Sequence, residues 1–327
     1  MVDITSPEDR LIARYFAPAA THPGALGLTD DAACIKPPSG CDLVLTVDAI
    51  VGGVHFFNDD AAAAIAAKAL RVNLSDIAAK GAKPLGFLLT LALPDTIADD
   101  WLAAFARGLR EDAASYNCPL LGGDTVRTPG PLMASVTLFG SVPEGRMVRR
   151  AGAQVGDRVY VTGTIGDAAL GLALRNGSTW PLDESQRDHL RSRYLAPQPR
   201  TALAQAVCDF ASAAMDVSDG LVGDLAKLCR VSGVAAAIDA ARVPLSEAAR
   251  AVIAAEPAMR DTAFTGGDDY EILCTVPPSK VDRFRVAAMA AKTAVTEIGV
   301  IEAGENARFL DSGGRSLTFA RTSFSHF

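Results

Sequence analysis

Aspartates recur along this chain at the ends of apolar runs, each beside glycine or another small residue. Carboxylates placed where strands end can converge, and such hard oxygen ligands suit Mg²⁺ or Ca²⁺ rather than zinc or copper. Two carboxylates about 4 Å apart repel by about 4 kcal/mol at an effective dielectric of about 20, so several can share one spot only with cations between them. The pattern predicts a metal-dependent enzyme that handles phosphate. The aspartates are Asp30, Asp31, Asp48, Asp76, Asp124, Asp216 and Asp219.

Two glycine pairs precede aspartates and could bring the backbone close to a phosphate. Gly122-Gly123-Asp124-Thr125 is expected to follow a strand at 119–121, and the segment 265–271 (TGGDDYE) repeats the theme ahead of another strand. Glycines let phosphate oxygens approach, and the next carboxylate can hold a bridging cation. Taken alone, each segment is also what a plain turn closed by an aspartate would look like. No Walker A sequence and no GxGxxG motif occurs, so neither a P-loop nor a dinucleotide fold is indicated.

Three further features keep a structural and a functional interpretation open. In the segment 216–220 (DVSDG), Ser218 or Asp219 could be the N-cap of a helix at 221–231, but a helix N-terminus also binds phosphate. His55 lies beside aromatic residues and could be packed or functional. The pair Arg149-Arg150 could be solvated or could clamp a phosphate.

Composition limits the class of protein. The 327 residues, 49% hydrophobic and 21% charged, suffice for two domains with separate cores. The net charge of −7 argues against a nucleic-acid or anionic-membrane partner. No apolar run has the length of a signal peptide or of a membrane span, so a cytoplasmic protein is expected. Six scattered cysteines without a CxxC pair predict reduced, buried thiols.

The hydrophobic pattern predicts an α/β fold with a mixed sheet in the first half, in the order β, α, β, α, β, β. We expect strands at 42–48, 84–94, 120–121 and 133–142, and helices at 61–80 and 98–117. Basic and small residues at 146–156 interrupt the pattern, which places a domain boundary there. The second half repeats the α/β style, with helices at 167–175, 184–194, 200–211, 221–231, 245–255 and 280–291 and strands at 235–239, 270–276 and 295–300.

Taken in order, several segments resemble the thiamine-monophosphate kinase family over nearly the whole chain. They are LIARYF, DDAA, TVD, GGVHF, VNLSDIAAKGA, LLGGDT, VTGTIGD, DVSDGL, GGDDYE and the terminal SFSHF. That family belongs to the aminoimidazole-ribonucleotide-synthetase-like ATP-binding superfamily. The resemblance implies two α/β domains, with residues 1–148 binding ATP and Mg²⁺ and forming a homodimer, and residues 149–327 completing the ATP and substrate sites.

The resemblance also implies residue roles. The family's Mg²⁺ ligands fall on Asp31, Thr46, Val47, Asp48, Asp76, Asp124, Asp216 and Asp219. Of these, Asp76, Asp124 and Asp216 would act in catalysis through the metal ions. The ATP contacts resemble Gly123, Asp124, Arg150 and Ser218, and the thiamine-phosphate contacts resemble His55, Asp268 and Phe324. The chain departs from the family pattern at Thr29, where Gly is common, and at Asp268, where Glu is expected.

The implied reaction is phosphorylation of thiamine monophosphate by ATP, the last step in making thiamine diphosphate. Rivals within the superfamily are selenophosphate synthetase, the hydrogenase-maturation member and the purine enzyme. The first two use a cysteine near the N-terminus or at the extreme C-terminus, whereas here Cys34 follows the DDAA motif and the chain ends in His326-Phe327. A non-catalytic nucleotide-binding or divalent-cation-binding module is the rival from another class.

Overall fold

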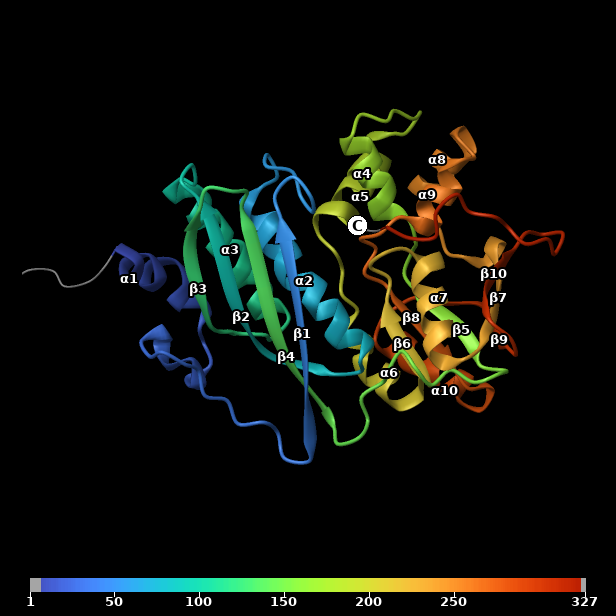
Figure 1. Cartoon of the computed structure of the whole chain (residues 1–327), viewed down its shortest axis with the longest axis horizontal. Coiled ribbons are helices and arrows are strands. Elements are labelled where there is room, and N and C mark those ends of the chain that lie inside the picture. Colours follow the sequence, from blue (N-terminus) through green and yellow to red (C-terminus); the bar gives the residue numbers. More distant parts are fainter. Residues whose placement is uncertain (1–6, 325–327) are drawn as a thin grey trace, which may run out of the picture. The chain divides into compact units, whose positions relative to one another are not determined.

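The structure is a computed structural model that describes residues 7–324 and divides into two compact units (Figure 1). Unit 1 comprises residues up to 77 together with 83–145, and unit 2 comprises 78–82 together with 146 onward. Of the terminal SFSHF motif, Ser325, His326 and Phe327 lie outside the described residues. No helix within 7–324 is long and apolar enough to cross a membrane.

Unit 1 is built on a four-stranded mixed sheet in the order β1-β4-β2-β3, in which only β2 and β3 run parallel. The predicted order of strands and helices is confirmed. A short helix α1 (Pro7–Leu11) is followed by a π-helical turn at Ile12–Phe16 and 3-10 segments at Ala17–Ala19 and Pro23–Leu28. The elements after them are β1 (Cys41–Val51), α2 (Ala62–Ala79), β2 (Lys83–Pro94), α3 (Asp99–Ser115), β3 (Leu120–Thr128) and β4 (Met133–Pro143).

Helix α2 covers one face of this sheet. A Cβ on Gly140 of β4 would lie 3.0 Å from Ile77 of α2, so Gly140 faces the helix. Because side chains alternate along a strand, Leu138 and Val136 share that face and are fully buried. The cross-strand partners of these two residues are Thr46 and Asp48 of β1, which therefore lie on the helix face as well.

One sequence expectation was wrong here. Gly122-Gly123-Asp124-Thr125 does not form a turn after a strand, because it lies inside β3. Pairing with β2 outweighs the weak strand preference of glycine. Gly123 is required by close packing, since a Cβ there would lie 1.9 Å from the Leu89 carbonyl oxygen.

Unit 2 is built on a six-stranded mixed sheet in the order β10-β7-β9-β5-β8-β6, in which only β10 and β7 run parallel. The strands are β5 (Arg158–Thr162), β6 (Ala213–Asp216), β7 (Ala235–Asp239), β8 (Ile272–Val276), β9 (Val295–Glu302) and β10 (Asn306–Leu310). The helices are α4 (Asp167–Arg175), α5 (Glu184–Leu195), α6 (Ala204–Phe210), α7 (Leu221–Ser232), α8 (Glu247–Ala255), α9 (Met259–Thr265) and α10 (Val281–Ala290).

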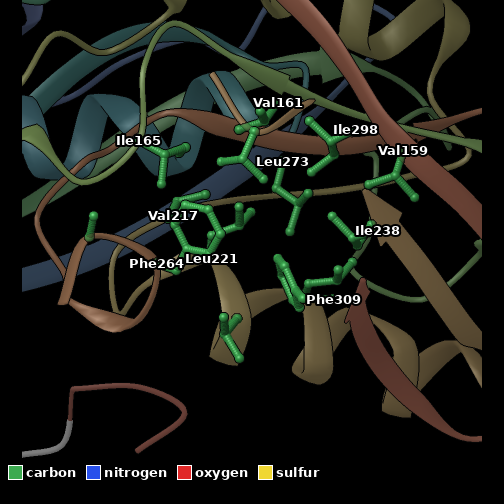
Figure 2. Packing of buried hydrophobic residues seen from close by; sticks show 14 of the residues in the cluster. Val159, Val161, Ile165, Val217, Leu221, Ile238, Phe264, Leu273, Ile298 and Phe309 are labelled. Carbon is green, nitrogen blue, oxygen red and sulfur yellow. The ribbon is translucent and has the colours of Figure 1, made fainter. Parts of the chain in front are cut away.

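Helices pack on both faces of this second sheet, so two hydrophobic cores form. Val159, Val161 and Leu273 face the larger core, which includes side chains of α4, α5, α7, α8 and α9 (Figure 2). The intervening Tyr160 and Cys274 face the smaller core with α6 and α10. This alternation is what a strand buried on both faces requires. The predicted α/β class with mixed sheets is therefore confirmed.

The predicted helices and strands of unit 2 are present within a few residues, except that 200–211 begins as a 3-10 turn at Thr201–Leu203 before α6. All six cysteines are free thiols, as predicted. Four of them are buried, but Cys34 is exposed and Cys41 is only partly buried, which corrects the expectation of burial for these two.

Candidate functional site

In unit 1, two of the expected metal ligands line a pocket of about 630 Å³ on the sheet face opposite α2. Asp31 comes from the DDAA segment and Asp124 from β3, and Asp30 joins them. The hydroxyl-bearing residues Thr90 and Thr137 also line it, and the remaining lining is largely apolar, from residues such as Phe16, Leu28 and Phe139. Carboxylate and hydroxyl oxygens are donors that suit Mg²⁺.

Three other expected ligands gather on the helix face of β1. The Thr46 hydroxyl donates to Asp76 Oδ2 of α2 at 2.5 Å, and the Asp48 backbone N–H donates to Asn73 Oδ1 at 3.0 Å. These contacts bring together Thr46, Asp48 and Asp76, although the residues lie 30 positions apart in sequence. Val47, between them, points its side chain to the opposite face and is 61% exposed, so only its carbonyl could serve a cation.

Unit 1 keeps these two groups apart. Asp124 is the Cα partner of Thr90, which lies on the pocket face, whereas Asp48 is the partner of Val136 on the helix face. Strands β1 and β3 are also the opposite edges of the sheet, three strand spacings or roughly 14 Å apart. Among residues 7–324, no three His, Cys, Asp or Glu side chains are placed to hold one metal ion together.

His55, expected at the substrate, follows β1. Its Nδ1 accepts a hydrogen bond from the Val51 backbone N–H at 3.0 Å, and its carbonyl accepts one from Lys68 Nζ at 2.8 Å. The first contact fixes the neutral tautomer with the proton on Nε2. Lys68 is almost fully buried, so it holds the loop rigidly and leaves the imidazole in a defined position.

In unit 2, three segments that are distant in sequence meet at what we call the loop junction, formed by residues 217–220, 266–271 and 322–324. The Asp268 and Tyr270 backbone N–H groups donate to the carbonyls of Ser218 and Val217, at 2.9 and 2.8 Å. The Phe324 N–H donates to the Asp219 carbonyl at 2.9 Å. The junction therefore brings together Ser218, Asp219, Asp268 and Phe324, four of the expected site residues.

Glycines permit this close approach. A Cβ on Gly267 would lie 2.3 Å from the Ser218 carbonyl oxygen, and one on Gly223 would lie 2.5 Å from Ser323 Cβ. Asp268 itself has a φ of +73°, a left-handed conformation that aspartate tolerates better than most residues. Asp216, the remaining expected ligand, is 3% exposed and ends β6 just before the junction.

The N-cap interpretation of Ser218 and Asp219 was wrong. The N-cap of α7 is Gly220, with a φ of +113°. The backbone N–H groups of Ser218 and Asp219 instead donate to Asp224 Oδ2, at 3.1 and 3.0 Å. Asp224 lies on the next turn and is fully buried, so this buried carboxylate shapes the junction from within the helix.

Asp224 and its partner Lys227 were not among the residues expected from the sequence. Lys227 Nζ donates to Asp219 Oδ2 at 2.5 Å and to Asp224 Oδ1 at 2.9 Å. Burial raises the pKa of Asp224, while the hydrogen bonds to both carboxylates outweigh burial and raise the pKa of Lys227 above 10.5. A signal existed, because Asp224 occupies the apolar helical stripe of Leu221, Leu225 and Leu228.

Buried ion pairs anchor the other side of the junction. Arg200 binds Glu271 through two hydrogen bonds, and Arg193 donates to Glu271 at 2.8 Å. Asp269 is 1% exposed and accepts from the Gly166 N–H at 2.7 Å at the start of α4. Burial raises the pKa of Asp269 well above 3.8. Because Asp269 and Glu271 point inward, Asp268 between Gly267 and Asp269 is the acid of this loop that stays partly exposed.

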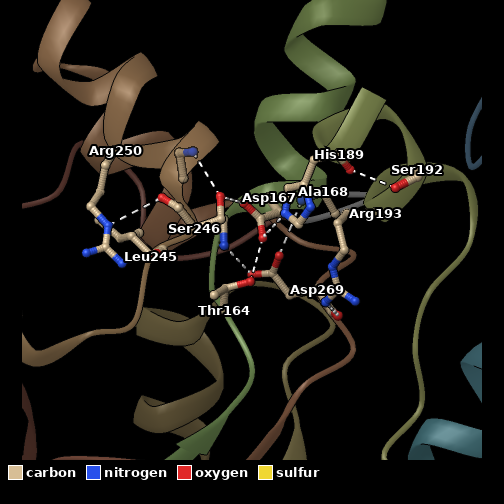
Figure 3. A network of polar contacts seen from close by, with 12 residues as sticks. Thr164, Asp167, Ala168, His189, Ser192, Arg193, Leu245, Ser246, Arg250 and Asp269 are labelled. Carbon is tan, nitrogen blue, oxygen red and sulfur yellow. Dashed lines mark hydrogen bonds and ion pairs between the residues drawn. The ribbon is translucent and has the colours of Figure 1, made fainter. Parts of the chain in front are cut away.

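The same end of α4 carries a second polar cluster (Figure 3). Asp167 is fully buried and accepts from Thr164 and Ser246, each at 2.5 Å, and contacts His189 Nε2 at 3.0 Å. Burial alone would raise the pKa of Asp167, but these hydrogen bonds hold it below 3.8. The same contact raises the pKa of His189 above 6.5.

The expected Arg149-Arg150 pair lies just before β5, and both side chains are exposed. The Arg149 carbonyl accepts from the Ala214 N–H of β6 at 3.0 Å, and the Arg150 carbonyl accepts from Ser232 Oγ at 3.2 Å. The backbone of the pair is thus fixed to unit 2, which leaves the guanidinium of Arg150 available for an anion.

Comparisons with known proteins agree with this architecture. The family model "AIR synthase related protein, N-terminal domain" matches residues 29–142, and the corresponding C-terminal domain model matches 154–311. A thiamine-monophosphate kinase of Caulobacter vibrioides is 43% identical over 96% of this chain and 89% of its own length. The chain belongs to the thiamine-monophosphate kinase family.

Solved structures of this family share the fold. The crystal structure of thiamine-monophosphate kinase from Stenotrophomonas maltophilia is 40% identical, with a TM-score of 0.80 over 89% of this chain and 91% of that one. The structure of AaThiL complexed with AMPPCP and TMP is 32% identical, with a TM-score of 0.78 over 91% of each chain. The two-domain fold expected from the resemblance is confirmed.

The Asp167–His189 pair predicts a pH dependence of stability. Replacing His189 by Gln keeps a hydrogen-bond donor but removes the charge, so the variant should be less stable than the wild type. Because the pKa of His189 is raised, the pair stabilises the folded state fully below pH 6.5, and this stabilisation is lost as the pH rises through the folded-state pKa of His189. Because the pKa of Asp167 is lowered, its contribution to stability is present above pH 3.8 and is lost as the pH falls through its folded-state pKa. The difference in unfolding free energy, measured by urea denaturation, should therefore be largest between pH 3.8 and 6.5.

The control is Arg191→Gln, an exposed position on the same helix, whose stability difference from the wild type should vary little over this pH range. A His189→Gln difference that grew above pH 7 would contradict the charged pair.

Proposed function

We propose that this chain transfers the γ-phosphoryl group of ATP to the phosphate of thiamine monophosphate, giving thiamine diphosphate and ADP. The observation that carries the proposal is the match over 91% of both chains to AaThiL complexed with AMPPCP and TMP. The loop junction supports it, because the chain holds together the segments that the resemblance assigns to nucleotide and substrate.

The chemistry demands little acid–base catalysis. A phosphate monoester has a second pKa of about 6, so the attacking oxygen is largely ionised near neutral pH. The main obstacle is repulsion between two phosphate groups, and Mg²⁺ supplies the positive charge that offsets it. The residues then have to orient the two substrates in line and exclude water.

The roles of individual residues follow as part of the proposal. Asp31, Thr46, Val47, Asp48, Asp76, Asp124, Asp216 and Asp219 would hold Mg²⁺ through oxygen atoms. Gly123, Asp124, Arg150 and Ser218 would contact ATP, and His55, Asp268 and Phe324 would contact thiamine monophosphate. Residues 1–148 would form the ATP-binding and dimerisation domain and 149–327 the domain that completes the sites. The free thiols support a reducing compartment, the cytoplasm.

We also propose a homodimer in which the sheet faces of unit 1 meet. Leu43, Leu45 and Val47 of β1 and Val126 of β3 lie on the face opposite α2 and are 40–61% exposed. An apolar surface of this kind is typical of a protein interface. Because β1 and β3 are the two edges of the sheet, a second copy could also lay the β1 edge of one protomer, which carries Asp48, beside the β3 edge of its partner, which carries Asp124.

The reaction is tested by measuring ADP release with and without thiamine monophosphate. We expect ADP to form only when thiamine monophosphate is present, in an amount equal to the thiamine diphosphate produced, and EDTA to abolish both. ADP release that did not depend on thiamine monophosphate would favour another ATP-using member of the superfamily. ATP binding without turnover of any substrate would favour a non-catalytic module.

The shared metal site is tested by subunit mixing. Asp48→Asn, Asp76→Asn and Asp124→Asn keep the side-chain shape but remove the charge, so each alone should lose nearly all activity while remaining folded. If Asp48 and Asp124 act across the interface, subunit exchange between Asp48→Asn and Asp124→Asn gives heterodimers with one intact site and restores up to about a quarter of wild-type activity.

Asp95→Asn is the matched control, because Asp95 is an exposed acid directly after β2 and its ion-pair partner within residues 7–324 is the equally exposed Arg127. It should keep wild-type activity. If Asp48 and Asp124 act within one protomer, mixing the Asp48→Asn and Asp124→Asn subunits restores no activity. That result would reject the shared metal site but would not contradict the proposed reaction.

Asp268 is predicted to contact the cationic part of the substrate. Asp268→Ala should weaken thiamine-monophosphate binding about ten- to a hundredfold, the effect of a charge-assisted contact of about 1.5–3 kcal/mol, with nearly unchanged ATP affinity. Asp268→Glu should be tolerated, because Glu is the residue expected from the family. Both ligands are titrated by calorimetry, with the exposed Asp282→Ala as control. Equal losses for both ligands would show that Asp268 shapes the loop instead.

A further inference from the structure

Lys227 is the cation that contacts the loop junction from within α7. It lies on α7 two turns after Asp219 and reaches back to that carboxylate at 2.5 Å. Its ammonium also binds Asp224 at 2.9 Å, so one positive charge serves two carboxylates. Neither the reaction nor the resemblance assigns Lys227 a role.

The two carboxylates differ in exposure, and this difference decides which contact is permanent. The Asp224 side chain is fully buried, whereas that of Asp219 is 38% exposed and that of Lys227 is 29% exposed. A buried carboxylate that loses its only cation is strongly destabilised, whereas an exposed one is solvated by water. The Lys227–Asp224 contact is therefore the fixed one, and the contact with Asp219 can be exchanged.

Asp224 also fixes the backbone that carries Asp219. Its second carboxylate oxygen accepts the N–H groups of both Ser218 and Asp219. The ammonium of Lys227 thus lies next to Asp219 whenever the junction has this geometry. A divalent cation that approaches Asp219 meets a positive charge already in hydrogen-bond contact with its ligand.

We propose that Lys227 is a positioning residue that acts as a replaceable counter-ion for Asp219. It keeps this ligand oriented and neutralised before substrates bind, and it weakens the binding of a bare divalent cation there. A metal ion then binds Asp219 firmly only when phosphate oxygens of a nucleotide complete its set of ligands. This inference rests on the proposed role of Asp219 as a metal ligand.

The test measures binding of Mn²⁺ to the full-length protein by the loss of the free-ion electron paramagnetic resonance signal, with and without AMPPCP. In the wild type, binding at Asp219 should be detectable only with AMPPCP. Lys227→Met should tighten Mn²⁺ binding without nucleotide by about tenfold or more, since a like charge beside the site is removed. Lys227→Arg keeps the charge and should behave as the wild type.

Two double variants make the result specific. In the double variant Lys227→Met with Asp219→Asn, Mn²⁺ binding without nucleotide should not be tightened, because the metal ligand Asp219 is then lost. Lys227→Met with Asp224→Asn should show the same gain as Lys227→Met alone. This second double variant removes the unpaired buried charge while keeping an oxygen for the Ser218 and Asp219 N–H groups, so it decides the question if Lys227→Met alone does not fold.

The possible failures are distinguishable. If Asp219→Asn weakens Mn²⁺ binding with AMPPCP but neither Lys227→Met variant tightens binding without it, the counter-ion role is overturned and the metal site stands. If Asp219→Asn binds Mn²⁺ as the wild type does in both conditions, Asp219 is not a ligand. That result overturns the metal assignment of Asp219 together with the role of Lys227.

Discussion

Backbone hydrogen bonds that continue the β6–β8 pairing beyond the end of β6 hold the loop junction of unit 2 together. The Val217 N–H donates to the Glu271 carbonyl, and the Tyr270 and Asp268 N–H groups donate back to Val217 and Ser218. These bonds connect two loops that are about 50 residues apart in sequence. Side chains on both loops can act on one ligand only because this backbone geometry is fixed.

Buried charges keep that geometry rigid. Glu271 is held by Arg193 and Arg200, Asp269 caps the start of α4, and Asp224 binds the opposite loop from within α7. Removing one partner of such a contact leaves a buried charge without compensation, which costs about 3–5 kcal/mol in typical proteins. The left-handed backbone of Asp268 and the short approach at Gly267 are stable only because these anchors lie on both sides of them.

Unit 1 follows a different constraint, the alternation of side chains along a strand. Thr46 and Asp48 lie on the face of the sheet that packs against α2. There the Thr46 hydroxyl donates a hydrogen bond to Asp76, and the Asp48 backbone N–H donates one to Asn73. Asp124 lies on the opposite face and at the opposite edge, beside the pocket that Asp31 also lines. The sheet thus separates these residues by face and by edge within one unit, and a second copy of the chain is proposed for that physical reason.

The sequence by itself determined the order of strands and helices, the α/β class and the family, because periodic apolar residues and short motifs are local properties. The resemblance in its motifs assigned roles to Ser218, Asp219, Asp268 and Phe324, and these roles stay predictions; the structure adds that the four residues meet at the loop junction. Only the tertiary structure showed that Gly123 belongs to a strand, that Gly220 caps α7, and that Lys227 and Asp224 support Asp219. Those features depend on contacts between segments that are distant in sequence. Such contacts determine which hydrogen-bond partner a backbone group has and which charged groups are desolvated.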